Sequence, residues 1–238
     1  MTTSDMATVL AFDPGGTTGW CAMSVKPEVL VGANNSADTL QSNLEVFKYG
    51  QIDCGTRHGE TGEGMNRGHG ALNLPGENRG VSEMLDMALH NREFANCPIV
   101  IEDFILQRSE SSRELLSPVR ITSSFSYGLW RVAPGQSDRM FLQNRSPVKT
   151  TCTDERLKRW NLYDRSSGPH ARDATRHAFY FLRDCRGSNM EAKQKRHLAW
   201  PHLYEDPNDV GGVGSISSDS STRTRHHGGN VKGERINL

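Results

Sequence analysis

The segment ATVLAFDPGG, residues 7–16, decides the fold of this chain. Its apolar run ends at Asp13, and the Pro-Gly-Gly that follows is typical of a buried strand that enters a tight turn. We therefore expect the carboxylate of Asp13 to stand at the end of a strand. The same residues also suit an ordinary turn, in which Asp13 only accepts hydrogen bonds from nearby backbone amides. This motif alone therefore does not assign a function.

Four further strands are expected along the chain, and the clearest contains Ile99, Val100 and Ile101. These residues favour a strand because β-branched side chains pack well on a pleated surface. The five expected strands cover residues 7–13, 19–25, 45–53, 98–104 and 139–144. The first three are close enough in sequence to form a meander.

Four helices are expected between and after these strands. The best of them covers residues 169–185, because Pro169 suits a first turn and apolar side chains recur on one face. Thr153 is expected to cap a shorter helix that runs through Trp160, and Ser82 to cap an earlier one. Another helix is expected over residues 118–132. A strand meander followed by alternating helices and strands indicates an α/β domain built of packed layers.

The length of 238 residues suits one domain that carries an insertion and a tail. Residues from about 55 to 80 are rich in glycine and polar residues, so we expect an irregular insertion there. Residues 205–238 have almost no apolar periodicity and are expected to form a disordered tail. The folded domain is therefore expected to occupy residues 1–204.

The composition limits the partners of the chain. Its 28 lysines and arginines balance 28 acidic residues, so any surface for nucleic acid must come from local clusters of charge. The five cysteines are dispersed and form no Cys-x-x-Cys pair, which indicates a reducing compartment. No stretch has the length of a membrane span or the pattern of a signal peptide, so we expect a cytoplasmic protein with no membrane partner.

Carboxylates at two other places complete a candidate site. Glu102 ends an apolar strand, where an unpaired carboxylate would be costly to bury, whereas Asp103 points to the opposite face. His170 and Asp173 are three residues apart in the expected helix and so share one face. Hydrolysis of a phosphodiester by two metal ions needs converging carboxylates, which Asp13, Glu102 and Asp173 can supply. The alternative is that Asp173 forms only a surface pair with Arg176 or His177, its neighbours on the same helix.

Three segments together resemble the RuvC family of Holliday junction resolvases, and its phage-borne members in particular. They are AFDPGGTTGW at residues 11–20, VIEDF at 100–104 and HARDATRH at 170–177. The resemblance runs in order from about residue 7 to residue 183, outside the glycine-rich insertion. It implies an RNase H-like fold, in which helices flank a central mixed five-stranded sheet. It also implies that the protein works in a bacterial cell or a phage-infected host.

The same resemblance implies a metal-dependent endonuclease that resolves four-way (Holliday) or other branched DNA junctions as a homodimer. Each site would use two Mg²⁺ or Mn²⁺ ions and leave 5′-phosphate and 3′-hydroxyl ends. It implies that Asp13, Glu102 and Asp173 are catalytic metal ligands. His170 would be a further ligand or would handle protons at the attacking water. Lys149 falls where the family carries a basic residue, so it is expected either to contact a phosphate or to be an exposed lysine in a loop.

Other basic and aromatic residues are candidates for contacts with DNA. Arg156, Lys158 and Arg159 lie together in one expected helix and could bind the DNA backbone. A second basic cluster consists of Lys193, Lys195 and Arg196. Solvated helix faces are the more common explanation for both clusters. The aromatic side chain with which the family probes a junction is expected among Phe125, Tyr127 and Trp130.

Three alternatives from other functional classes stay open. Residues 13–18 resemble the first phosphate loop of actin-like and sugar-kinase-like ATP-binding domains, although those proteins need a second lobe and an adenosine loop. The fold can also bind junctions without cutting them, as a catalytically inactive protein. Finally, Cys54, His58 and His69 can be imagined as a zinc site, but their spacing lacks a second cysteine pair.

Overall fold

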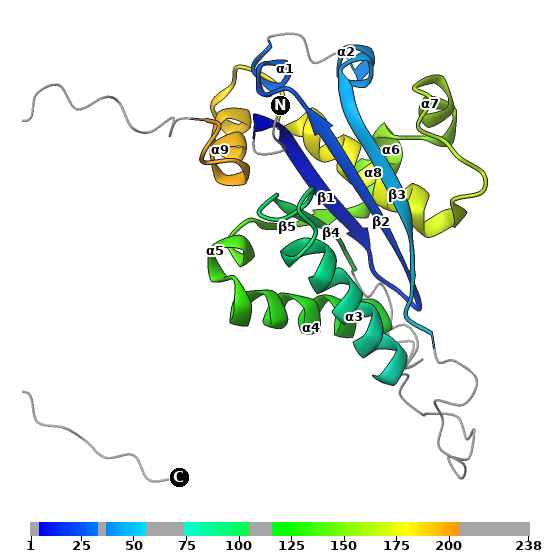
Figure 1. Ribbon diagram of the computed structural model, residues 1–238. Helices are drawn as coiled ribbons and strands as arrows, with labels where there is room; N and C mark the ends of the chain where they lie inside the picture. The colour runs from blue at the N-terminus through cyan, green and yellow to red at the C-terminus, as the bar shows by residue number, and fades with distance from the viewer. Residues whose placement is uncertain (1–4, 33–36, 56–73, 105–115, 205–238) are drawn as a thin grey trace, which may run out of the picture. The chain divides into compact units, whose positions relative to one another are not determined.

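A mixed five-stranded sheet forms the centre of this computed structural model, which describes residues 5–32, 37–55, 74–104 and 116–204 (Figure 1). The strand order is β3-β2-β1-β4-β5. Strand β1 is antiparallel to β2, which is antiparallel to β3, whereas β4 runs parallel to both β1 and β5. The strands are β1 (Ala7–Asp13), β2 (Thr17–Val25), β3 (Leu44–Asp53), β4 (Ile99–Asp103) and β5 (Met140–Asn144). This order and these directions confirm the expected mixed five-stranded sheet.

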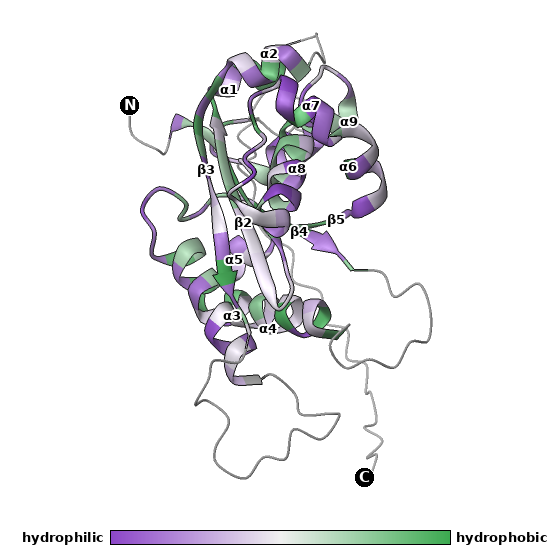
Figure 2. Ribbon diagram, turned by 90° about the vertical axis from the view of Figure 1, so that its right-hand side faces the viewer, coloured by the Kyte–Doolittle hydropathy of each residue, from purple (hydrophilic) through white to green (hydrophobic). Residues whose placement is uncertain are grey.

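Two layers of helices cover the sheet, one on each face (Figures 1 and 2). Side chains of β1 alternate between the layers, as a strand buried on both faces requires. Val9 and Ala11 belong to the apolar core beneath α8, while Leu10 and Phe12 belong to the core beneath α3 and α4. The helices are α1 (Pro27–Val31), α2 (Ala37–Ser42), α3 (Leu74–Leu89), α4 (Ser117–Val132), α5 (Pro134–Ser137), α6 (Arg145–Thr151), α7 (Asp154–Arg159), α8 (Gly168–Asp184) and α9 (Met190–Ala199).

Helix α8 lies unusually close to strand β2 at its first turn. A Cβ atom added to Gly19 would lie 2.0 Å from the carbonyl oxygen of His170, which is far inside van der Waals contact. The glycine at this position therefore allows the helix to approach the sheet. Ala171, Ala174 and Ala178 are small side chains buried on the same helix. This contact brings the first turn of α8 to the end of β1.

The structure corrects the expected start of α3. Ser82 is not an N-cap, because the helix begins at Leu74, and residues 74–80 are helical rather than part of an irregular insertion. Tertiary contacts explain the difference. Glu77 is buried and accepts hydrogen bonds from Arg120 of α4 at 2.7 and 2.5 Å. A Cβ atom on Gly80 would lie 2.1 Å from the Cys54 sulfur, so this glycine allows α3 to pack against the end of β3.

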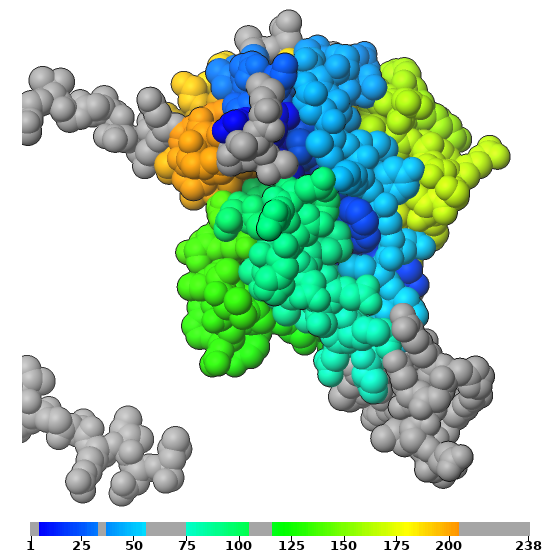
Figure 3. All heavy atoms as spheres, viewed as in Figure 1, coloured from blue at the N-terminus to red at the C-terminus, as the bar shows by residue number. Residues whose placement is uncertain are grey.

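Helices α3 and α4 pack side by side and present one continuous surface (Figure 3). The expected helix over residues 118–132 is confirmed as α4, and that over residues 153–160 as α7. Thr153 caps α7 as expected, accepting a hydrogen bond from the backbone N–H of Arg156. No helix in the described part of the chain is long and apolar enough to cross a membrane.

Five helices of the described residues were not expected from the sequence, namely α1, α2, α5, α6 and α9, and two of them contain basic candidates. Lys149 lies in α6 rather than in a loop. Arg196 lies in α9, where it is buried and donates to the carbonyl oxygens of Leu30, Cys185 and Gly187. Arg196 is therefore a structural residue, and its expected place in a DNA-binding cluster was wrong. The expected tail over residues 205–238, with His58 and His69 of the zinc alternative, lies outside the described residues.

Candidate metal centre

Three carboxylates that are remote in sequence meet at one edge of the sheet. Phe12 of β1 is paired with Ile101 of the parallel β4, so the residues that follow, Asp13 and Glu102, lie side by side at the ends of these strands. Asp173 reaches the same place from the second turn of α8. One oxygen from each of Asp13, Glu102 and Asp173 lies within 4.8 Å of the other two. Among the described residues, this is the one group of three or more acidic, histidine or cysteine side chains so arranged.

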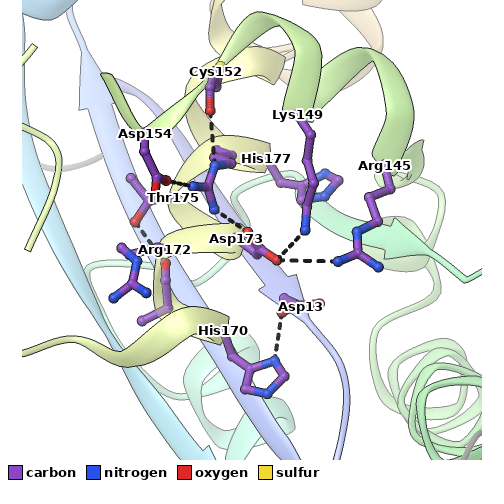
Figure 4. A network of polar contacts seen from close by, with 12 residues as sticks. Asp13, Arg145, Lys149, Cys152, Asp154, His170, Arg172, Asp173, Thr175 and His177 are labelled. Carbon is purple, nitrogen blue, oxygen red and sulfur yellow. Dashed lines mark hydrogen bonds and ion pairs between the residues drawn. The ribbon is translucent and has the colours of Figure 1, made fainter. Parts of the chain in front are cut away.

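Asp13 is buried and is held by His170. The Nδ1 atom of His170 lies 2.9 Å from Oδ2 of Asp13 (Figure 4). Burial raises the pKa of the Asp13 carboxyl above its usual range, and the charges of Glu102 and Asp173 act in the same direction. The hydrogen bond from His170 offsets only part of this shift. The pKa of His170 is raised, chiefly by its hydrogen bond to Asp13.

Asp173 is surrounded by three cationic side chains. Its Oδ2 lies 2.8 Å from Nζ of Lys149 and 4.0 Å from a guanidinium nitrogen of Arg145, while Arg176 pairs with Oδ1 (Figure 4). Burial alone would raise the pKa of Asp173, but these three cations outweigh it and hold the pKa below its usual range. The cluster is therefore electrostatically asymmetric. The surroundings of Asp173 on α8 favour the ionised carboxylate, whereas those of Asp13 on β1 disfavour it.

Glu102 is held on both sides by groups from different elements. Its Oε2 lies 3.0 Å from Nε2 of His177, and its Oε1 lies 3.4 Å from Nε of Arg145. The other ring nitrogen of His177 lies 2.7 Å from Oε1 of Gln143, the residue opposite Glu102 on β5. His177 and Glu102 are both buried. The neighbouring Asp103 does not belong to the trio, as its opposite direction on the strand led us to expect.

The residues at this edge fit a divalent metal of the Mg²⁺ type. Such ions prefer oxygen ligands, and three carboxylate oxygens converge here from three separate elements. Packing three mutually repelling carboxylates together is costly without a cation, and the raised pKa of Asp13 reflects this cost. His170 is hydrogen-bonded to this group, and its side chain is 41% exposed, so it remains accessible.

The residues expected to bind DNA fall into two sets. Lys149 lies at the carboxylates and is 36% exposed. Arg156, Lys158 and Arg159 lie together on α7, but each also has a partner within the chain. Arg156 donates to the carbonyl oxygens of Thr150 and Thr151, Lys158 lies over the ring of Tyr163, and Arg159 pairs with Asp38 at 3.9 Å. Their contact with DNA stays a prediction.

Sequence reasoning missed three contributors to this centre. Arg145 directly follows β5, and only the β5–α6 junction turns it toward Glu102 and Asp173. His177 was noted only as a neighbour of Asp173, but it bonds to Glu102 instead. Gln143 carries no signal in the sequence beyond its place in a strand. The spacings of three and four residues between His170, Asp173 and His177 were the available clue that His177 shares their face of the helix.

The structure also reduces the aromatic candidates. Phe125 is fully buried and packs edge-on against Phe12, with ring centroids 5.5 Å apart, so the expectation that it can probe DNA is wrong. Tyr127 and Trp130 are 61% and 56% exposed on α4, and their ring centroids are 6.1 Å apart. These two side chains remain the candidates.

No protein-family model matches the chain, and no curated protein matches it by sequence. Among solved structures, the fold is similar to that of RuvC from Thermus thermophilus, both in a structure of the protein and in one described as a complex with a Holliday junction substrate. The TM-score is 0.42 for each, with 14% and 13% sequence identity respectively. Each match covers 74% of this chain and 93% of the other.

Proposed function

We propose that this chain is a metal-dependent, structure-selective endonuclease that cuts four-way or other branched DNA junctions by phosphodiester hydrolysis. The observation that carries the proposal is the meeting of Asp13, Glu102 and Asp173, with one oxygen from each within 4.8 Å of the others. The sequence resemblance to junction resolvases supports the substrate. The rival ATP-binding reading has less support, because the described residues form a single sheet rather than the two lobes it needs.

Two Mg²⁺ or Mn²⁺ ions would be held by Asp13, Glu102, Asp173 and His170. When bound, such ions activate a water molecule and stabilise the leaving oxygen. The chain's own contribution is to hold four ligands from three elements at one sheet edge. Lys149 and Arg145 add positive charge beside the carboxylates, and Arg145 is 57% exposed. We propose that both bind oxygens of the phosphodiester, which positions the DNA backbone at the carboxylates.

Branched DNA and a second copy of the chain are the proposed partners. Paired nicks across a four-way junction need two sites, and a homodimer supplies them. Because the overall charge is balanced, DNA binding depends on local cations such as Lys149, Arg145 and the cluster on α7. Sedimentation of the free protein should then give twice the 26.5 kDa mass of one chain.

The function is tested with labelled four-way junctions in Mg²⁺ or Mn²⁺, beside duplex, flap and single-stranded controls. We expect Asp13→Asn and Glu102→Gln to lower the cleavage rate at least about 100-fold, because each removes an anionic ligand. Junction binding should survive. Asp103→Asn is the matched control, since this neighbouring acid lies outside the trio, and it should cut normally.

The products give an independent check. Ends with 5′-phosphate and 3′-hydroxyl groups should be resealed by a DNA ligase without prior treatment. Equal cutting of every substrate would overturn junction selectivity but keep a nuclease. Junction binding with no cutting in either metal would instead support the inactive junction-binding alternative.

A further inference from the structure

We propose that His177 is a positioning residue for the metal centre, which fixes Glu102 so that its Oε1 is the oxygen that binds metal. The inference rests on the proposed metal site and goes one step further. It concerns a side chain outside the set of ligands and the choice between the two oxygens of one carboxylate.

The first observation is that three hydrogen-bonded polar side chains, Glu102, His177 and Gln143, are buried together. His177 has no exposed surface, and Gln143 and Glu102 are 8% and 7% exposed. Burying polar groups is costly unless they are hydrogen-bonded, and here each bonds to the next. Because an ionised carboxylate can only accept, Nε2 of His177 is the donor to Oε2 of Glu102 at 3.0 Å.

The second observation is that these three side chains come from three different elements. Glu102 and Gln143 are opposite each other on the neighbouring strands β4 and β5. His177 lies on α8, one helical turn after Asp173, and so comes from the helix that supplies another ligand. The hydrogen bond between His177 and Glu102 therefore fixes α8 relative to β4. Two of the three carboxylates are set in place by one contact.

The two oxygens of Glu102 have different surroundings. Oε2 faces the buried imidazole, whereas Oε1 faces Arg145, which is 57% exposed and lies 3.4 Å away. A metal ion can replace an exposed arginine at Oε1 without breaking a buried contact. Hydrogen bonds to ligating carboxylates orient them, and removing such partners typically lowers metal affinity or activity about 10–100-fold.

A matched pair of substitutions separates positioning from packing. In His177→Gln, the side-chain amide can reach about as far as Nε2 and still donate to Glu102. In His177→Asn, the amide reaches only about as far as Nδ1, so it can bond Gln143 but not Glu102. Both variants are polar and differ by one methylene. His197→Leu, on α9, is the control for a histidine that bonds a backbone carbonyl elsewhere, that of Tyr204.

The readout is the binding of Mn²⁺ alone, measured by calorimetry well below the melting temperature, followed by the Mn²⁺ dependence of cleavage. We expect His177→Asn to weaken Mn²⁺ binding at least about 10-fold, and to raise the Mn²⁺ concentration for half-maximal cleavage by the same factor. The KM for the junction should not change. His177→Gln should stay close to the unmodified protein, and His197→Leu should bind Mn²⁺ normally.

Equal Mn²⁺ affinity in His177→Asn, His177→Gln and the unmodified protein would overturn the inference, and so would equal losses in both variants. If His177→Asn does not fold, the failure of His177→Gln to retain Mn²⁺ affinity would count against it in the same way. Glu102→Gln separates the two levels of proposal. If that variant binds Mn²⁺ normally, the metal centre itself is wrong. If Glu102→Gln loses Mn²⁺ binding but both His177 variants bind Mn²⁺ normally, the metal centre is supported and the positioning role of His177 is wrong.

Discussion

At the scale of single residues, the site packs three carboxylates together, which lowers the stability of the folded protein. Asp13 is buried next to two other carboxylates, and its pKa is raised, chiefly by burial. A group whose pKa is raised in this way is less stable in its ionised form in the folded chain than in the unfolded one. At neutral pH, the charge of Asp13 therefore works against folding. Such a cost is typical of residues that are kept for function rather than for stability.

This argument predicts that Asp13→Asn makes the metal-free protein more stable. The asparagine keeps an acceptor for His170 and removes one of three repelling charges. At neutral pH in chelator, we expect the melting temperature to rise by about 2 °C, which corresponds to somewhat less than about 1 kcal/mol for a chain of this size. Calorimetric melting curves measure this. Adding Mn²⁺ should raise the melting temperature of the unmodified protein far more than that of the variant. A lower melting temperature for Asp13→Asn in chelator would contradict the account.

At the scale of elements, the first turn of α8 determines where His170 and Asp173 stand. The helix can approach β2 because position 19 carries no side chain, and a Cβ there would meet the His170 carbonyl oxygen at 2.0 Å. The site thus depends on a residue that takes no part in its chemistry. Any change that moves this helix should also separate Asp173 from Glu102.

We therefore expect Gly19→Ala to destabilise the protein by about 1–3 kcal/mol, as overpacking does, and to lower cleavage further than stability alone explains. Gly16→Ala is the matched control, since nothing lies within 4 Å of a Cβ atom there. It should change stability by less than about 1 kcal/mol. Denaturant titration gives the two free energies of unfolding. Similar values for both variants would show that the close approach of α8 is not as tight as described.

Local sequence patterns explain which helices and strands could be predicted. Strands β1 and β4 and helix α8 have apolar patterns that only one kind of element satisfies, so their ends placed Asp13, Glu102 and Asp173 correctly. The start of α3 was missed because its polar residues and glycines are explained by contacts with Arg120 and Cys54, which are remote in sequence. Helix α9 was missed because only Ala192, Arg196 and Ala199 of it are buried. The roles of Arg145 and Gln143 depend on strand pairing, so no local pattern could reveal them.

At the scale of the whole molecule, we propose the exposed aromatic side chains of α4 as contacts for a splayed DNA branch. Tyr127 and Trp130 are more than half exposed, although large aromatic side chains are usually buried. Their proximity to each other offers flat surfaces on which bases can stack. Phe125 on the same helix instead belongs to the core.

We expect Trp130→Ala and Tyr127→Ala each to weaken junction binding about 5–150-fold, because stacking on one aromatic side chain contributes about 1–3 kcal/mol per base. Melting temperatures should change little, since both side chains are exposed. Val132→Ala is the control on the same helix, because valine is exposed but has no ring. Binding is measured by fluorescence anisotropy with a labelled junction in Ca²⁺ or chelator. Unchanged affinity in both aromatic variants would exclude α4 as a junction contact.

The most direct test of the central claim is a crystal structure of the protein soaked in Mn²⁺, with anomalous scattering used to locate the ions. The account predicts anomalous peaks within about 2.0–2.3 Å of carboxylate oxygens of Asp13, Glu102 and Asp173, in the range of metal–oxygen bonds. A peak within the same range of a His170 ring nitrogen would make that residue a ligand as well. The absence of any peak at this edge of the sheet at millimolar Mn²⁺, in a fold that is otherwise unchanged, would contradict the metal centre and the nuclease with it.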